Sequence, residues 1–249
     1  MSGHSKWATI KHKKGALDKR RGKLFAKLIK QVEVAARQGG GDITANATLR
    51  TMVQKARDAS VPNDTIERAV KRGTGELEGI DYQPVTYEGY APHGVAVLIE
   101  VLTDNRNRAS GEVRALFSKN GGALAEPGAV GWQFSRTGVM YVPKSVEEVE
   151  LMLVALDAGA DDITDDGEMW RVTCPPNQLA AVREAVEGAG IAFESADVTM
   201  LPSTSVVLDS VEAAKAVLKL IDLLDDNDDV DGVYANFDVP DVIMAQVEG

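Results

Sequence analysis

The sequence has one cysteine, three histidines and no long hydrophobic run, and each scarcity excludes a class of protein. With Cys174 alone, an intramolecular disulfide is excluded and a reducing compartment is favoured. The histidines are too scattered to form a zinc site with a single cysteine. No stretch approaches the roughly 18 apolar residues of a transmembrane helix, and no apolar segment follows the basic N-terminus as in a secretory signal. We therefore expect a cytoplasmic protein with no membrane partner.

Charge is divided unevenly along the chain. Residues 1–72 hold 17 of the 27 Lys and Arg residues against 6 of the 38 Asp and Glu residues, a net charge of +11. The other 177 residues hold 10 basic and 32 acidic residues, a net charge of −22. A cationic segment attracts polyanions and releases their counterions on binding. The division therefore predicts contact with nucleic acid through the N-terminal part of the chain.

Residues 1–75 are predicted to form a basic arm and an all-α domain of three helices. The arm, residues 1–17, has few apolar residues and cannot bury a core by itself. Residues 18–37 place apolar side chains on one side of a helix and cationic ones on the other, and three glycines follow. Helices are also expected over 45–59 and from just after Pro62, with Asn63 or Asp64 as the cap, to Gly73; a turn of helix-turn-helix length joins them. An ordinary three-helix bundle with a solvated basic face would explain the same spacing.

Beyond a linker at 73–81 the pattern becomes α+β. One compact unit has the order βαββαβ, the ferredoxin-like arrangement, from strands near 139–142, 162–163, 169–173 and 191–199 and helices over 146–158 and 177–188. Before it come expected strands at 85–90, 95–102, 123–124 and 131–134 and a helix at 109–120; after it come a helix at 210–224 and a strand at 233–239. We therefore expect a second ferredoxin-like βαββαβ domain into which the compact unit is inserted. The predicted domains are 1–75, 82–135 plus 204–249, and 136–203.

The candidate nucleic-acid-binding residues are mostly cations. Lysine and arginine neutralise phosphates, while Trp or His can stack on an unpaired base. The candidates in the arm and first helix are Lys6, Trp7, Lys11, His12, Lys13, Lys14, Arg20, Lys23, Lys27 and Lys30, and the third helix adds Arg68. The alternatives are a solvated tail with Trp7 packed on the helices, and a helix face that is merely solvated.

Arg106 and Arg108 form a second candidate point, at the start of a predicted helix. Cations there oppose the helix dipole, by a few tenths of a kcal/mol each. An anionic partner such as RNA phosphate would reverse the penalty, and so would an internal salt bridge to a carboxylate such as Glu88. We expect an anion contact at this point, with the internal salt bridge as the alternative.

Acidic clusters suggest two further possibilities, both weak. Residues 227–238 approach the spacing of an EF-hand loop, but the last is Asp rather than Glu, and Pro240 stands where an exit helix should begin. We expect an acidic turn between a helix and a strand. The aspartates at 161–162 and 165–166 could hold Mg²⁺ in a phosphodiesterase, but we expect them only to solvate a turn. We therefore expect no cofactor, no metal and no catalytic residue.

Several segments resemble the YebC/PmpR family. They are MSGHSKW at 1–7, IKHKK at 10–14, FAKLIK at 25–30, YEGYAP at 87–92, GVA at 94–96 and LTDNRNR at 102–108. The resemblance covers essentially the full length and is most specific in the first half. It implies an all-α N-terminal domain and two α+β domains, the third inserted into the second. It also implies a regulator of gene expression and offers no catalytic residues.

Two functions stay open within that resemblance. The family is usually described as DNA-binding transcriptional regulators, but related members, including a mitochondrial activator of cytochrome oxidase synthesis, resemble translation factors, some acting at the ribosome on proline-rich sequences. A DNA reader would place the third helix in a groove and show sequence preference. A translation factor would use the arm on ribosomal RNA. Readers of palindromes normally dimerise, and since no dimer seam is visible we expect a monomer, which favours RNA slightly.

Overall fold

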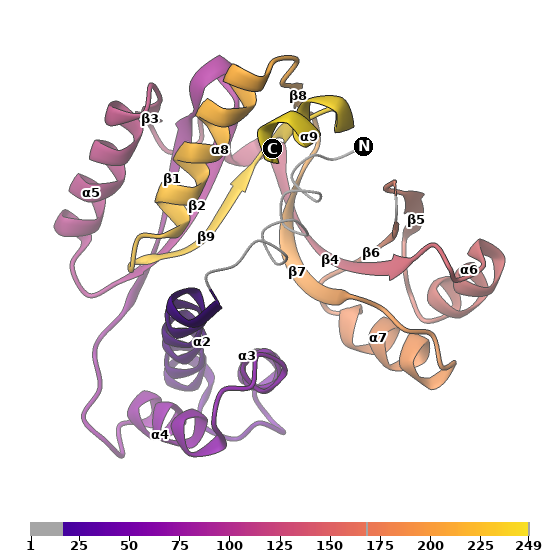
Figure 1. The fold of residues 1–249 in the computed structure, drawn as a ribbon. Helices are drawn as coiled ribbons and strands as arrows, with labels where there is room; N and C mark the ends of the chain where they lie inside the picture. The colour runs from indigo at the N-terminus through magenta and orange to yellow at the C-terminus, as the bar shows by residue number, and fades with distance from the viewer. Residues whose placement is uncertain (1–16, 168, 249) are drawn as a thin grey trace.

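The computed structural model describes residues 17–167 and 169–248 and consists of a helical domain and two α+β domains (Figure 1). The predicted class, a multidomain α+β protein with all-α and ferredoxin-like parts, is confirmed. In the described residues, no helix is long and apolar enough to cross a membrane. The boundaries 1–75, 82–135 plus 204–249, and 136–203 stay predictions.

The helical domain contains α2 (Leu17–Gly39), α3 (Ala47–Asp58) and α4 (Asn63–Thr74). Its core is apolar, with Val32, Leu49 and Ile66 almost fully buried. Asn46 joins two of the helices: its side-chain oxygen accepts from the Leu49 amide and caps α3, while its amide donates to two carbonyls at the end of α2. This packing fixes which face of α2 is turned away from the helical core.

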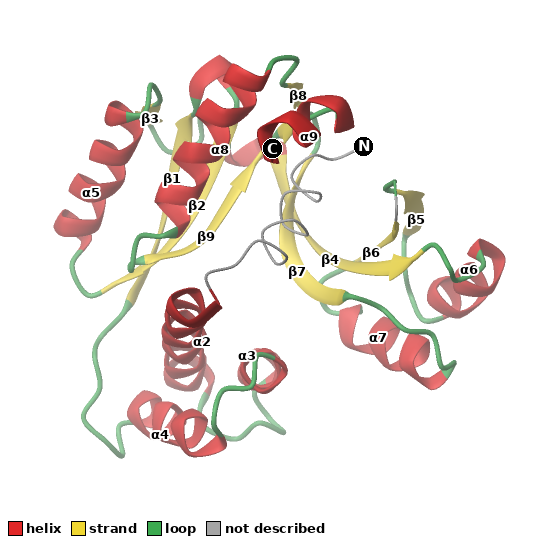
Figure 2. Ribbon diagram, viewed as in Figure 1, coloured by secondary structure: helices red, strands yellow, loops and turns green. Residues whose placement is uncertain are grey.

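The first sheet has the order β3-β1-β2-β9, with every neighbouring pair antiparallel. Its strands are β1 (Gln83–Tyr90), β2 (Ala96–Thr103), β3 (Ala123–Ala125) and β9 (Val230–Ala235). Helices α5 (Arg106–Lys119) and α8 (Val211–Asp225) cover one face (Figure 2). The central strand β2 is buried on both faces. Its second face, which carries Glu100 and Leu102, is therefore directed toward the other domains.

The second sheet lies between β3 and α8 in the chain and has the order β5-β6-β4-β7, again antiparallel. Its elements are β4 (Phe134–Pro143), α6 (Glu148–Asp157), β5 (Asp162–Asp165), β6 (Met169–Cys174), α7 (Leu179–Gly188) and β7 (Ser195–Pro202). Both helices pack on one face through Leu151, Val182 and Val186. This is the ferredoxin-like order that the sequence predicts.

The structure differs from the predicted elements at several points. The split domain has the order β1-β2-α5-β3 before the insertion and α8-β9 after it, instead of the expected βαββαβ, because a 3-10 turn (Pro92–Gly94), with His93 at positive φ, closes a β1–β2 hairpin before the first helix. Residues 131–133 form a 3-10 turn rather than a strand. The expected strand at 233–239 is divided between β9 and β10 (Phe237–Asp238), and β10 pairs in parallel with β8 (Val206–Val207). Helix α9 (Asp241–Glu248), after Pro240, is not predicted from the sequence.

Candidate nucleic-acid interface

Part of the predicted interface lies outside the residues that the structure describes. Lys6, Trp7, Lys11, His12, Lys13 and Lys14 belong to residues 1–16. Arg20 lies in α2, but its side chain is not described. These candidates stay predictions. The described candidates are Lys23, Lys27, Lys30, Arg68, Arg106 and Arg108.

Three lysines of α2 contact residues 225–231, a segment at the end of α8 that we call the acidic turn; they are Lys23, Lys27 and Lys30. Lys23 Nζ lies 2.6 Å from a carboxylate oxygen of Asp226 and 2.7 Å from its carbonyl oxygen. Lys27 Nζ donates to the carbonyl oxygen of Asp225 at 2.8 Å. Lys30 Nζ donates to the carbonyl oxygen of Asp228 at 2.8 Å. The three lysines stand at positions i, i+4 and i+7 and therefore lie on one side of the helix. The predicted basic face of α2 is thus joined to the split domain.

These contacts have a plain electrostatic cause. The last carbonyls of a helix have no partner within it and carry partial negative charge. Helix α8 has no basic residue in its last turn, so lysines from another domain supply the cations. The acidic turn offers carbonyl and carboxylate oxygens to these lysines, much as a phosphate backbone offers phosphate oxygens.

Arg108 makes the internal salt bridge that the sequence allowed as an alternative, although its partner is not Glu88. Its Nη2 lies 2.8 Å from the buried carboxylate of Asp229 and 2.7 Å from that of Asp104. The hydrogen bond to Asp229, followed by that to Asp104, raises the pKa of the guanidinium. The Thr103 hydroxyl also donates to Asp229, at 3.0 Å. The segment LTDNRNR is therefore bonded to the acidic turn through Thr103 and Arg108.

Arg106 and Arg68 are placed differently from Arg108. Both side chains are exposed, and neither makes an ion pair with a described residue. On α4, Lys71 is exposed in the same way, three residues from Arg68. Arg72, by contrast, is turned inward, with Nε 2.9 Å from the buried carboxylate of Glu33. Two cations of α4 therefore face solvent without an ion pair to any described residue.

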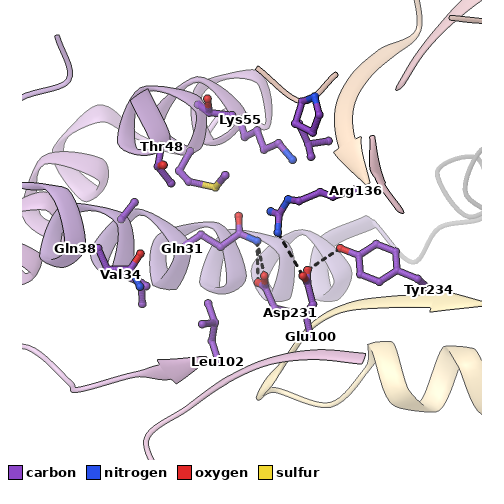
Figure 3. A pocket seen from close by; sticks show the side chains of 15 residues that line it. Gln31, Val34, Gln38, Thr48, Lys55, Glu100, Leu102, Arg136, Asp231 and Tyr234 are labelled. Atoms are coloured by element: carbon purple, nitrogen blue, oxygen red, sulfur yellow. Dashed lines mark hydrogen bonds and ion pairs between the residues drawn. The ribbon is translucent and has the colours of Figure 1, made fainter. Parts of the chain in front are cut away.

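A cleft of about 420 Å³ lies where the three domains meet, beside the α2 contact (Figure 3). Gln31 donates its amide to both carboxylate oxygens of Asp231, at 2.8 Å each. The Tyr234 hydroxyl donates to Glu100 at 2.9 Å, and Arg136 lies 3.6 Å from the same carboxylate. Burial raises the pKa of Asp231, and the Gln31 bond opposes this rise. The polar groups of the cleft are thus largely paired with one another.

Two observations complete the chemistry of the described residues. Gln31 Oε1 is buried without a hydrogen-bond partner, on the side of the amide opposite to Asp231. No group of three or more His, Cys, Asp and Glu side chains is arranged to hold a metal ion in the part of the chain that the structure describes. The carboxylates of the acidic turn instead receive lysine and arginine, and the segment is a helix-to-strand turn.

Two family models match the chain. A model described as "TACO1/YebC protein N-terminal domain" matches residues 5–76, and one described as "TACO1/YebC second and third domain" matches residues 82–237. The chain belongs to the TACO1/YebC family. Similar TACO1/YebC relatives include proteins of Beutenbergia cavernae, 55% identical over 251 aligned residues, and of Salinispora arenicola, 57% identical over 249. These alignments cover 100% and 99% of this chain and 99% and 100% of the relatives.

Both relatives carry the name "Probable transcriptional regulatory protein", so the family supports a regulator. A crystal structure of a conserved hypothetical protein from Aquifex aeolicus is 44% identical, with a TM-score of 0.79. The match covers 90% of this chain and 93% of that one. The three-domain arrangement therefore occurs in a solved structure that is similar to this chain.

In this TACO1/YebC protein, the acidic residues that pair with the cations of α2, α4 and α5 are not predicted from the sequence. Glu33 lies on the otherwise apolar side of α2, where an isolated acid signals a buried partner, and it receives Arg72 and Arg37. In the sequence, Asp229 and Asp231 indicate only an imperfect EF-hand-like loop. Charge of opposite sign in two distant segments was visible in the sequence, but their pairing depends on tertiary structure.

Proposed function

We propose that the chain is a non-enzymatic regulator of gene expression that binds nucleic acid through its basic N-terminal domain, with DNA as the primary target. The observation that carries the proposal is the division of charge, +11 over residues 1–72 and −22 over the rest. Contacts from Lys and Arg to phosphate supply most non-specific affinity for nucleic acid. The name shared by the relatives supports a role in transcription.

The exposed cations of α4 are the best-placed described residues for the first phosphate contacts. Arg68 and Lys71 are three residues apart and share one side of the helix. Neither has to leave an ion pair with the described part of the chain to meet a phosphate. Helix α4 follows α3 after the turn 59–62, and in helix-turn-helix proteins the second helix enters the major groove. We assign α4 the role of the DNA-contacting helix.

Lys23, Lys27 and Lys30 of α2 would join this surface by releasing the oxygens of the acidic turn and binding phosphate oxygens. Phosphate oxygens would replace the carboxylate and carbonyl oxygens of the acidic turn around Lys23, Lys27 and Lys30. Nucleic acid and the acidic turn therefore compete for one set of ammonium groups. In this proposal the basic arm and Arg20 extend the same surface, and Arg106 provides a separate phosphate contact.

A first experiment compares two matched pairs of substitutions. Arg68→Ala with Lys71→Ala is tested against Lys215→Ala with Lys219→Ala, which removes two cations of α8 that are also exposed. Fluorescence anisotropy with labelled duplex DNA is measured at several salt concentrations. We expect the α4 pair to weaken binding and to lower the slope of log affinity against log salt by about one per lost contact. Equal effects from both pairs would contradict the role of α4.

A ribosome-associated translation factor is the second candidate, supported by the resemblance to the mitochondrial activator. Sedimentation of the tagged chain on a sucrose gradient, with and without nuclease, separates it from the first. Comigration with intact ribosomes that is lost in Lys11→Ala, Lys13→Ala, Lys14→Ala would favour ribosomal RNA as the target. Absence from ribosomal fractions, together with a sequence preference that Arg68→Ala relaxes, would favour DNA.

A further inference from the structure

Helix α6 of the inserted domain has an apolar outer face. Its inward residues Leu151 and Ala155 are fully buried in the domain core. On the opposite side, Val149 is 69% exposed and Leu153 is 66% exposed. Met152 and Leu156 are also exposed large hydrophobic residues. The helix is thus apolar on the side that faces solvent as well as on the side that faces the core.

These four residues form one continuous stripe. They stand at positions i, i+3, i+4 and i+7, which lie above one another on one side of a helix. Helix α7 packs on the same sheet and provides a comparison: its exposed positions are Ala180, Ala181, Glu184, Glu187 and Gly188. An ordinary outer helix face in this domain is therefore polar or small. Contiguous apolar surface rimmed by polar groups marks interaction sites.

The rim of the stripe is acidic. Helix α6 has no Lys or Arg, and Glu148, Glu150 and Asp157 flank the stripe, with Glu147 directly before the helix. None of these four carboxylates makes an ion pair with a described residue. The nearest basic residue in sequence, Lys144, is already held by Asp165 and the ring of Trp170. The carboxylates are therefore available to a basic partner.

Charge decides between the possible occupants. Residues 136–203 hold 4 basic and 13 acidic residues, a net charge of −9. A second copy of α6 would bring like charges together, and nucleic acid or an anionic lipid surface would be repelled. A helix that carries apolar residues at the same spacing and Lys or Arg beside them complements both the stripe and its rim.

We propose that the outer face of α6, formed by Val149, Met152, Leu153 and Leu156, binds a basic amphipathic helix of a partner protein. Figure 1 shows α6 at the end of the molecule opposite to α5, on a domain other than the one that carries α2 and α4. The inserted domain would then recruit a protein while the helical domain contacts a different target. This inference stands on its own observations and does not depend on nucleic-acid binding.

The test uses the full chain and two synthetic helical peptides. Both peptides have leucines at i, i+3, i+4 and i+7; one has flanking lysines and the other has flanking glutamates. Anisotropy of the labelled peptides is measured against the wild type, against Val149→Gln with Leu153→Gln, and against Val242→Gln, which alters a side chain of α9 that is 71% exposed. Because all three positions are exposed, thermal denaturation should show that every variant is folded.

We expect saturable binding of the Lys-flanked peptide, weakened about tenfold or more by the α6 pair and unchanged by Val242→Gln. The Glu-flanked peptide should bind at least about tenfold more weakly, and Glu148→Gln with Glu150→Gln should reduce the preference between the peptides. Failure of the Lys-flanked peptide to bind, equal binding of both peptides, or indifference to the α6 pair would overturn the proposal.

Two further measurements distinguish the other occupants. Sedimentation velocity of the wild type and the α6 pair tests for self-association, and flotation with phosphatidylglycerol vesicles tests for lipid binding. Dimerisation or vesicle binding that the α6 pair abolishes would assign the face to a second copy or to a membrane and overturn the proposal. A monomer that does not bind vesicles, together with the expected peptide result, would support it.

Discussion

Lys27 Nζ lies 2.8 Å from the carbonyl oxygen of Asp225, the last residue of α8, and this contact joins the basic helix α2 to the acidic body of the chain. The same ammonium group lies 3.3 Å from the Asp225 carboxylate. A lysine of the helical domain thus donates to a carbonyl group at the C-terminal end of a helix in a different domain. The segment whose charge predicts nucleic-acid binding already binds carbonyl and carboxylate oxygens within the molecule, so neutralisation of the carboxylates should change nucleic-acid affinity.

We predict that Asp226→Asn with Asp228→Asn strengthens nucleic-acid binding. Both side chains are exposed, and both lie near Lys23, with Asp226 at 2.6 Å and Asp228 at 4.0 Å. Their neutralisation weakens the internal competitor, so affinity at low salt should rise about threefold to tenfold. Anisotropy with labelled duplex DNA and RNA measures the change. Asp161→Asn with Asp162→Asn removes the same charge elsewhere, and an equal gain there would attribute the effect to net charge alone.

Substitutions of Arg106 and Arg108 should affect different properties: nucleic-acid binding for Arg106 and stability for Arg108. Arg108→Ala leaves the buried Asp229 without its closest ionic partner and should lower the melting temperature by several degrees. Arg106→Ala removes no ion pair between described residues, so it should leave the melting temperature unchanged while it weakens nucleic-acid binding. Arg114→Ala, another exposed cation of α5, is the control for binding. If Arg106→Ala and Arg114→Ala bind equally well, the anion contact at Arg106 is wrong.

Glu88→Gln should give a pH-dependent loss of stability. The Glu88 carboxylate accepts backbone N–H groups of Gly128, Val130 and Gly131 at 2.6 to 2.7 Å. Burial opposes ionisation, but these three bonds prevail and lower the pKa of Glu88 below its ordinary value of 4.5. Substitution should cost about 1–3 kcal/mol at neutral pH, measured by denaturant unfolding.

The direction of this pH dependence follows from the lowered pKa. The folded state favours the ionised carboxylate, so the stabilisation is complete above pH 4.5 and is lost as the pH falls through the lower pKa of the folded state. The difference between wild type and Glu88→Gln should be constant from pH 6 to 8, within about 0.5 kcal/mol, and shrink below 4.5. A difference that grows on acidification would contradict the assignment.

The sequence predicts those parts of the fold that depend on local pattern. Helices α2, α3 and α4, the two α+β domains and the insertion follow from periodicity and from glycine and proline positions. The 3-10 turn at Gly131–Gln133 does not, since Glu88, more than forty residues away, determines it. The contacts of Lys23 and Lys27 join positions about two hundred residues apart. The charge pattern indicates that α2 is basic and that the acidic turn is anionic. Only the tertiary structure shows that the two segments are in contact.

Asp231→Asn should stabilise the protein at neutral pH. Gln31 donates its amide to both oxygens of Asp231, while Gln31 Oε1 is buried without a partner. An asparagine can accept from Gln31 Nε2 and, after rotation, donate to Gln31 Oε1, which satisfies the orphaned oxygen and removes a desolvated charge. The gain should be about 1 kcal/mol, or roughly 2–4 °C in melting temperature.

The pH dependence of this gain distinguishes its two causes. Burial raises the pKa of Asp231 in the folded state, so its contribution is most favourable at low pH and is lost as the pH rises through the raised value. The advantage of Asn over Asp should therefore be largest at pH 7 to 8 and decrease toward pH 4. Gln31→Leu in the Asp231→Asn background should lose the part due to the paired amides. A destabilised Asp231→Asn variant at pH 7 would show that Lys27 and Lys55, which favour the charged form of Asp231, outweigh its burial.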